Sequence, residues 1–164
     1  MSRKLMDREL LQSLYRYCIC LTGNSALAED LLQTAVESWL KSSSRPVQLK
    51  AYLRKVIRNQ FIDDCRRLKL VDFEPLDDNA PVLLDETCLE EIEIQHNLIE
   101  YLFEQLNPAE REVLYLWAIE GYSAAEIAAD LHQPRGTILS RLHRIKLKTA
   151  DLALDDSAQT IGGQ

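Results

Sequence analysis

The sequence of 164 residues lacks a long hydrophobic run, and this absence excludes several classes of protein. No stretch approaches the roughly 20 uninterrupted apolar residues of a membrane-spanning helix. Leu5 is followed almost at once by the charged residues Asp7, Arg8 and Glu9, so the apolar block of a signal peptide is missing. The hydrophobic share of 46% is nevertheless enough to build a core. We therefore expect a cytoplasmic protein with one or two small folded domains.

Motifs for metal binding and catalysis are also missing. The cysteines, Cys18, Cys20, Cys65 and Cys88, form neither a CxxC pair nor a zinc-knuckle spacing. The sequence has no HExxH-like histidine pair, no glycine-rich phosphate loop and no nucleophile elbow. We therefore expect no metal, no cofactor, no small-molecule substrate and no enzymatic activity. Free cysteines are commonly buried as small hydrophobes, and we favour that role here over redox sensing.

Basic side chains are absent from the middle of the chain. Residues 71–105 carry 11 acidic and no basic side chains, whereas residues 1–70 carry 13 basic and 7 acidic ones. The net charge of −7 would by itself argue against nucleic-acid binding. The acidic side chains, however, are concentrated in the block at 71–105. Blocks of like charge as long as this one are usually linkers or tails. We predict a basic domain at 1–70, an acidic linker at 71–88, a second domain at 89–152 and a flexible tail at 153–164.

Strand-like alternation is absent too, and apolar residues recur at helical spacing, which predicts an all-α fold. We expect helices over about 10–21, 25–40, 47–68 and 89–106, and a fifth from residue 108. Ser25 is the expected N-cap of the second helix. Asn107 is the expected N-cap of the fifth, with Pro108 at its first position.

The most specific pattern is a helix pair within residues 122–148. Ser123 and Glu126 form a capping-box pattern before a short helix. Ile138 and Leu142 predict that a longer helix packs back on the short one, as in a helix-turn-helix. Early residues of such a helix reach base edges, and later cations hold phosphates. An ordinary two-helix corner with solvated cations has the same spacing. The candidate DNA contacts are Arg135, Thr137, Ser140, Arg141, Arg144 and Lys148.

The predicted second and third helices each carry a polar face. On the third, Lys50, Arg54 and Arg58 are spaced i, i+4 and i+8, with Asn59 at the edge of the same face. This cationic ridge fits nucleic acid, although a solvated face gives the same pattern. On the second helix the polar residues complement the helix dipole or form a protein-docking edge, and the sequence leaves both open. These residues are Glu29, Asp30, Gln33, Thr34 and Glu37.

The two modules together resemble bacterial extracytoplasmic-function sigma factors. Three segments resemble the polymerase-binding part of that family: LYRY at 14–17, LTGN at 21–24 and AEDLLQT at 28–34. The segment AYLRKVIRNQFID at 51–63 resembles its promoter-melting part. Three more resemble its second domain: LNPAEREVL at 106–114, EGYSAAEIA at 120–128 and GTILSRLHR at 136–144. The resemblance covers about residues 10–70 and 90–150, in the family's order.

The resemblance implies a sigma factor that binds core RNA polymerase and promoter DNA, with an anti-sigma protein as a further partner. Its polymerase-binding residues would be Glu29, Asp30, Leu31, Gln33, Thr34 and Glu37. The proximal promoter element would be melted by Arg45, Arg54, Arg58, Asn59, Asp63 and Arg66, with Asn59 at the position that holds an extruded base. The upstream element would be read by Arg135, Gly136, Thr137, Ser140, Arg141, Arg144 and Lys148. His132 stands where the family has a turn glycine. The alternative is a stand-alone, dimeric helix-turn-helix regulator.

Overall fold

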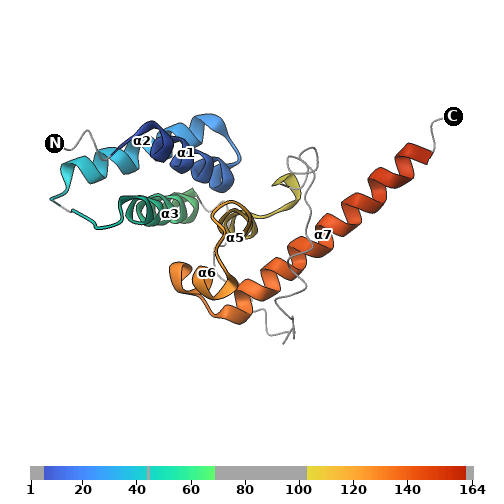
Figure 1. Cartoon of the computed structure of the whole chain (residues 1–164). Coiled ribbons are helices and arrows are strands. Elements are labelled where there is room, and N and C mark those ends of the chain that lie inside the picture. Colours follow the sequence, from blue (N-terminus) through green and yellow to red (C-terminus); the bar gives the residue numbers. More distant parts are fainter. Residues whose placement is uncertain (1–5, 44, 69–102, 162–164) are drawn as a thin grey trace. The chain divides into compact units, whose positions relative to one another are not determined.

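A computed structural model of the chain describes residues 6–43, 45–68 and 103–161, with side chains up to residue 151. The chain divides into two compact units, Met1–Glu74 and Pro75–Gln164 (Figure 1). All regular structure in the described ranges is α-helical, which agrees with the predicted fold class. The predicted linker at 71–88 and most of the predicted fourth helix lie outside the described residues.

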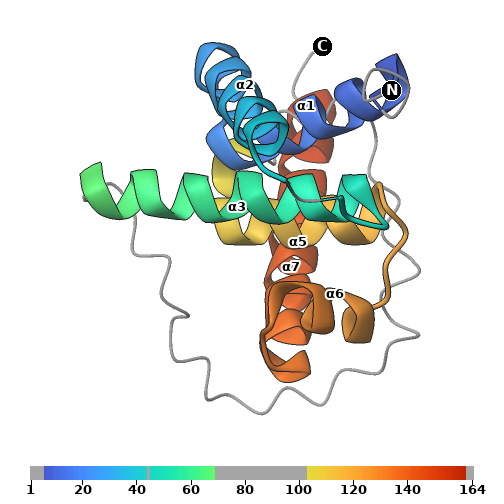
Figure 2. The same cartoon turned by 90° about the vertical axis from the view of Figure 1, so that its left-hand side faces the viewer.

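The first unit is a bundle of helices α1 (Arg8–Thr22), α2 (Ser25–Lys41) and α3 (Leu49–Leu68). Each helix contacts the other two, and Figures 1 and 2 show α1 and α2 on the same side of α3. The core of the unit consists of buried apolar side chains, among them Leu14, Tyr17, Leu21, Leu31, Trp39, Leu53 and Ile57. These residues are the apolar stripes of the three helices, so the helical spacing in the sequence corresponds to the packed faces.

The N-cap of α2 differs from the predicted one, because of the turn that joins α1 to α2. Gly23 has a left-handed φ of 64°, and its N–H donates to the carbonyl of Ile19 at 2.8 Å, which ends α1. Asn24 then follows in an extended conformation, and its side chain accepts from the N–H of Leu27 at 3.0 Å. Ser25 is therefore the first helical residue and not the N-cap. Asn caps a helix at least as well as Ser, and the left-handed glycine places Asn24 at the start of the new helix.

The second unit contains α5 (Pro108–Ala118), α6 (Ala124–Leu131) and α7 (Arg135–Ile161). Figure 2 shows α6 beside the first turns of α7, and both α5 and α6 contact α7. Both predicted helix starts are confirmed, because Asn107 and Ser123 each form a complete capping box with the glutamate three residues later. In the turn between α6 and α7, His132 takes the left-handed conformation, with φ of 52°, at the position where the resembled family has a glycine.

Helix α7 is longer than the sequence analysis predicted. It continues to Ile161, whereas a flexible tail was expected from residue 153. The reason lies in composition, because no glycine or proline occurs between Gly136 and Gly162. Residues 152–161 include two alanines and two leucines, which are strong helix formers. The acidic residues there do not prevent helix formation.

Candidate nucleic-acid interface

Helix α3 exposes the predicted residues Asn59, Asp63 and Arg66, but not the ridge of Lys50, Arg54 and Arg58. The residues that face solvent are Lys55, Asn59, Asp63 and Arg66, spaced i, i+4, i+8 and i+11, and we call them the α3 stripe. It lies opposite the core positions of the helix, which include Ile57 at 0% exposure. Lys55 was missed by the sequence analysis. Its position on the side opposite the apolar residues is the signal that identifies it.

The predicted cationic ridge on α3 needs correction at Arg54. Arg54 is only 3% exposed and interacts within the protein, and it lies one turn before the fully buried Ile57. Buried charged side chains in proteins are almost always paired, so this guanidinium has a structural role and is not on a DNA-facing surface. Lys50 and Arg58 are half-buried at the border of the same face. Arg45 is exposed in the segment that leads into α3.

Helix α2 presents a polar outer edge that is formed by Glu29, Asp30, Gln33, Thr34 and Glu37, all exposed. Gln33 donates to Glu37 at 3.0 Å, and Glu37 pairs with Lys41 at 3.8 Å. The Glu29 and Asp30 carboxylates make no hydrogen bond or ion pair with any of the described residues. Leu31, which was predicted to bind polymerase with this edge, is 5% exposed and belongs to the core.

The helix-turn-helix packs as predicted. Ile127, Ile138 and Leu142 are completely buried between α6 and α7, and Leu131 is 6% exposed. These side chains fix the angle between the two helices, so the first turn of α7 is held rigidly by α6. A rigid first turn is what a base-reading helix requires.

Arg141 and Lys148, two of the predicted DNA contacts, are engaged inside the second unit. Arg141 is 6% exposed, and its Nη1 donates a hydrogen bond to Oε1 of Gln133 in the turn. The Lys148 ammonium lies 2.8 Å from Oε2 of Glu110 and 3.2 Å from the carbonyl of Gln105. The prediction is therefore corrected for both residues, since their charged groups stabilise the turn and the contact between α5 and α7.

Glu110 connects helix capping to the position of α7. Its carboxylate, in a side chain only 3% exposed, accepts from the backbone N–H of Asn107 at 3.1 Å and from Lys148. Leu106, Leu114 and Ile145 form an apolar cluster in the same unit, with Phe103 and Trp117 packed against it. A buried carboxylate with two donors is well compensated, so this pair holds the middle of α7 against the start of α5.

The remaining predicted contacts lie at the start of α7. Arg135 and Gly136 are exposed, Thr137 and Arg144 are half-buried, and Ser140 is 8% exposed and hence shielded. Gly136 does not have a positive φ, and a Cβ added there would meet nothing within 4 Å. Neither the backbone nor the packing of the described residues therefore requires glycine at position 136. A missing side chain also allows another molecule to approach the backbone closely.

The cysteines of the first unit are buried and free, as predicted. Cys18, Cys20 and Cys65 are between 0% and 7% exposed. Burial, and to a smaller extent the neighbouring Cys20, raises the pKa of the Cys18 thiol from its ordinary 9.0 to about 12. Burial, together with the charge of Asp64, also raises the pKa of Cys65. High pKa values keep these thiols protonated and unreactive at neutral pH. The described residues contain no cluster of three or more potential metal ligands.

Comparisons with known proteins agree with the two-unit architecture. Residues 6–70 match the family model "Sigma-70 region 2", and residues 96–148 match "Sigma-70, region 4". The chain is 32% identical over 138 residues to the ECF RNA polymerase sigma factor SigL of Mycobacterium tuberculosis, covering 79% of this chain and 76% of SigL. It is 30% identical over 159 residues to the ECF RNA polymerase sigma factor SigE of Mycolicibacterium smegmatis, covering 93% of this chain and 62% of SigE.

A solved structure shares the fold. The sigma factor RpoE from Bartonella quintana, crystallised in complex with the anti-sigma factor NepR, superposes with a TM-score of 0.62 at 24% identity. The alignment covers 88% of this chain and 92% of RpoE.

An all-helical chain with a region 2 unit followed by a region 4 unit defines a sigma factor of the sigma-70 type. Within that class, the chain belongs to the ECF RNA polymerase sigma factors. It therefore acts with core RNA polymerase at promoter DNA in transcription initiation. This assignment replaces the alternative of a stand-alone dimeric regulator. No helix within the described ranges is long and apolar enough to cross a membrane.

Proposed function

We propose that the first unit melts the proximal promoter element and that the second unit reads the upstream element as duplex. The observation that carries this proposal is the position of Asn59, which is exposed in the α3 stripe between Lys55 and Asp63. An amide side chain both donates and accepts hydrogen bonds and so suits the edge of an unpaired base. The flanking cations Lys55 and Arg66 then hold the backbone of the opened strand.

The cost of melting supports a dedicated surface for the single strand. Extruding a base costs a few kcal/mol, which contacts to the opened strand must offset. We assign this role to Arg45, Lys55, Asn59 and Arg66, with Arg58 at the border of the surface. Asp63 lies within the stripe and disfavours phosphate close to it, which favours contact with a base at that point. Arg54 supports α3 from inside.

In the second unit, the exposed start of α7 enters the major groove. Arg135 and Thr137 are placed to reach base edges or phosphate, and Gly136 lets the DNA backbone approach closely. Arg144, two turns later, contacts phosphate. Arg141, Lys148 and the shielded Ser140 hold the helix in position and contribute to recognition indirectly.

The outer edge of α2 is the proposed polymerase-docking edge. We define it by its exposed residues Glu29, Asp30, Gln33, Thr34 and Glu37. The two carboxylates that make no ion pair among the described residues, Glu29 and Asp30, suit a basic partner surface. Because RpoE binds NepR, we also propose that an anti-sigma protein binds this chain and competes with polymerase.

The test separates melting from duplex binding. Asn59→Ala in the holoenzyme is expected to reduce open-complex formation about tenfold on duplex promoter DNA, about 1.4 kcal/mol. On a template with a pre-melted, mismatched proximal element, the same variant is expected to recover most of its activity. The closed complex, measured at low temperature, should form normally. Equal loss on both templates would contradict the melting role and indicate structural damage to α3.

A further inference from the structure

The turn between α6 and α7 holds Gln133 by both its backbone and its side chain. The backbone N–H of Gln133 donates to the carbonyl of Ala128 at 3.0 Å, a bond typical of a helix that ends in a left-handed residue. Its side-chain Oε1 accepts from Nη1 of Arg141, which is 6% exposed. Gln133 is therefore fixed to α6 through its backbone and to α7 through its side chain.

The pairing with Arg141 determines which part of the Gln133 amide faces outward. A guanidinium carries donors and no acceptor, so the amide atom that faces it must be the oxygen. The other amide atom, Nε2, carries two N–H donors. It makes no hydrogen bond with any described residue and is not buried. Gln133, which is half-buried as a whole, therefore presents the donor side of its amide to the solvent.

This donor side lies at the start of α7, where the proposed DNA-reading surface begins. Gln133 is followed directly by Pro134, Arg135 and Gly136, all of which are exposed. The N–H groups in the first turn of a helix carry a partial positive charge that favours anions. The amide donors of Gln133 add to these groups. A molecule that approaches this end of α7 therefore has to present hydrogen-bond acceptors.

We propose that Gln133 contacts the upstream promoter element, and that Arg141 positions its amide so that Nε2 donates to an acceptor on the DNA. The acceptor is a phosphate oxygen or an acceptor atom on a base edge. A bidentate contact with adenine is excluded, because it uses both amide atoms and the oxygen of Gln133 faces Arg141. Since the side chain is already held in place, binding costs little conformational entropy. This inference rests on the proposed reading of the upstream element by the second unit.

The experiment measures the affinity of the holoenzyme for upstream-element DNA with substitutions at position 133. Gln133→Met keeps the length of the side chain and removes both donors, and we expect affinity to fall about fivefold, the effect of one lost hydrogen bond. The log–log salt slope should not change, since both side chains are neutral. Gln133→Glu keeps an oxygen for Arg141 but removes the donors and adds a negative charge. It should therefore bind more weakly than Gln133→Met while its second unit is at least as stable, as measured by urea unfolding.

Modified DNA distinguishes a direct contact from a structural role. A methylphosphonate replaces one phosphate oxygen by a methyl group, and a base-pair substitution changes the acceptors on the base edges. At the contacted position, the modification should weaken binding by the parent chain and cost Gln133→Met much less. At all other positions the two proteins should lose affinity equally. Coupling to one phosphate would assign the contact to the DNA backbone, and coupling to one base pair would assign it to a base edge.

The outcomes also separate this inference from the proposed function. If Arg144→Ala weakens DNA binding and Gln133→Met binds as the parent chain does, the Gln133 contact is wrong and the DNA face of α7 stands. If neither variant weakens binding, both proposals are wrong. A loss by Gln133→Met that is equal on every modified DNA would contradict the contact, because it would reflect a shift of the whole helix.

The positioning role of Arg141 has its own test. Arg141→Met should lower the affinity for DNA, because the amide of Gln133 is then no longer held in one orientation. Adding Gln133→Met to this variant should cost less affinity than it does in the parent chain. Equal costs in the two backgrounds would mean that Arg141 does not position Gln133.

Discussion

Helices α3 and α7 carry similar series of cations, yet the protein uses them differently. In α3, Lys55 and Arg66 lie on the side that faces solvent. In α7, Arg141 and Lys148 make hydrogen bonds and an ion pair inside the second unit. The spacing along the sequence is helical in both cases, so spacing identifies residues that share a face. It does not identify which face packs.

The difference follows from what surrounds each helix. The first half of α7 packs against both α5 and α6, so a large part of its surface faces the core of the unit. Polar residues at the edge of this packed surface therefore interact with residues of the neighbouring elements. Arg141 meets Gln133 in the preceding turn, and Lys148 meets Glu110 at the start of α5. Helix α3 has a solvent-facing side opposite Ile57, and Lys55 and Arg66 are exposed on that side.

The largest expected effect, a loss of stability, comes from removing the charge of Lys148, which pairs with Glu110 between α7 and α5. Lys148→Met leaves the buried Glu110 carboxylate without its charged partner, and we expect the second unit to lose about 2 kcal/mol of stability. This value lies between those of exposed and fully buried pairs, because the Lys148 side chain is 37% exposed. Urea unfolding of the full chain is the measurement. In promoter binding by the holoenzyme, the log–log salt slope should not change. A slope reduced by about 0.9 would mean that Lys148 contacts phosphate after all.

The two units should also differ in alkaline solution. The unfolded chain releases the Cys18 proton near pH 9, whereas the folded first unit retains it up to about pH 12. The unfolded state therefore binds fewer protons above pH 9, so the stability contribution is complete below pH 9 and is lost as the pH rises toward 12. At pH 10 the loss is on the order of 1 kcal/mol. Trp39 and Trp117 lie in different units, so single-tryptophan variants report each unit separately.

The matched control for this pH effect is Cys18→Ala. Its first unit should be less stable at every pH, but the decrease between pH 8 and pH 10 should be smaller than in the parent chain. An equal decrease would assign the alkaline effect to other groups.

A substitution at Arg144 tests the proposed DNA face of α7. Arg144→Ala is expected to lower promoter affinity about fivefold, roughly 1 kcal/mol, and to reduce the salt slope by about 0.9. Lys148→Met provides the contrast, since it should change stability and leave the slope intact. The measurement is holoenzyme binding to upstream-element DNA across a range of salt concentrations. An unchanged slope for Arg144→Ala would place the phosphate contacts elsewhere on α7.

The smallest expected effect comes from replacing Gly136, which should raise the stability of the second unit and lower its affinity for DNA. Gly136→Ala should raise the stability of the second unit by about 0.5–1 kcal/mol, because alanine is the better helix former and the space is open. The same change should weaken binding to upstream-element DNA. Gly121→Ala is the control, since Gly121 has equally open space but a φ of 72°, and alanine there should destabilise. Tighter DNA binding by Gly136→Ala would refute the close approach.

Much of the fold could be predicted from the sequence, because its determinants are local. Capping boxes at Asn107 and Ser123 depend on residues three positions apart, and a left-handed turn at His132 is required by the helices on either side. Where local signals compete, the prediction shifts by a residue, as it does at Asn24 and Ser25. The tail from residue 153 was judged by charge, whereas helix propensity decided its structure.

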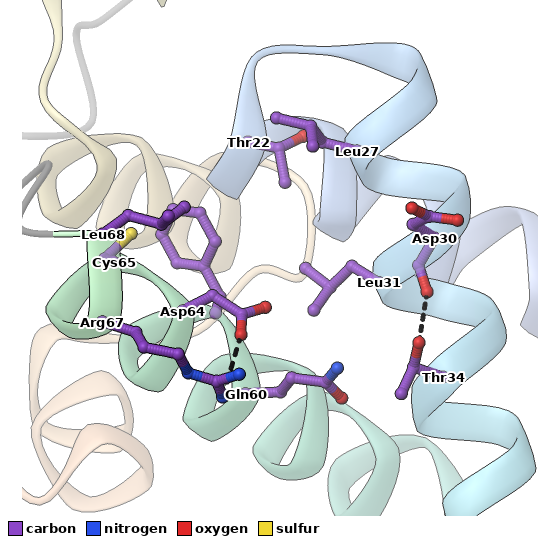
Figure 3. Close-up of a pocket in the computed structure, with 11 residues that line it drawn as sticks. Thr22, Leu27, Asp30, Leu31, Thr34, Gln60, Asp64, Cys65, Arg67 and Leu68 are labelled. Atoms are coloured by element: carbon purple, nitrogen blue, oxygen red, sulfur yellow. Dashed lines mark hydrogen bonds and ion pairs between the residues drawn. The ribbon is translucent and has the colours of Figure 1, made fainter.

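The candidate sites were only partly predictable, because they depend on contacts between distant residues. The burial of Arg54 and the ion pair between Glu110 and Lys148, 38 residues apart, follow from packing and leave no trace in helical spacing. The surface groove between α2 and α3, which Leu27 and Leu68 line, is similar, because these residues become neighbours only after the bundle forms (Figure 3). The outer edge of α2 was predictable because every member lies on one helix.

The Glu110 carboxylate has a consequence for how the second unit folds. Its Oε2 atom accepts from the backbone of Asn107, a local contact, and from Lys148, a contact across the unit. Helix initiation at α5 and the docking of α7 therefore depend on the same atom. Neither event is complete without the other, so we expect α5 and α7 to form in a single cooperative step. Substitutions at 110 and 148 should accordingly be non-additive, with the double variant less destabilised than the sum of the single ones.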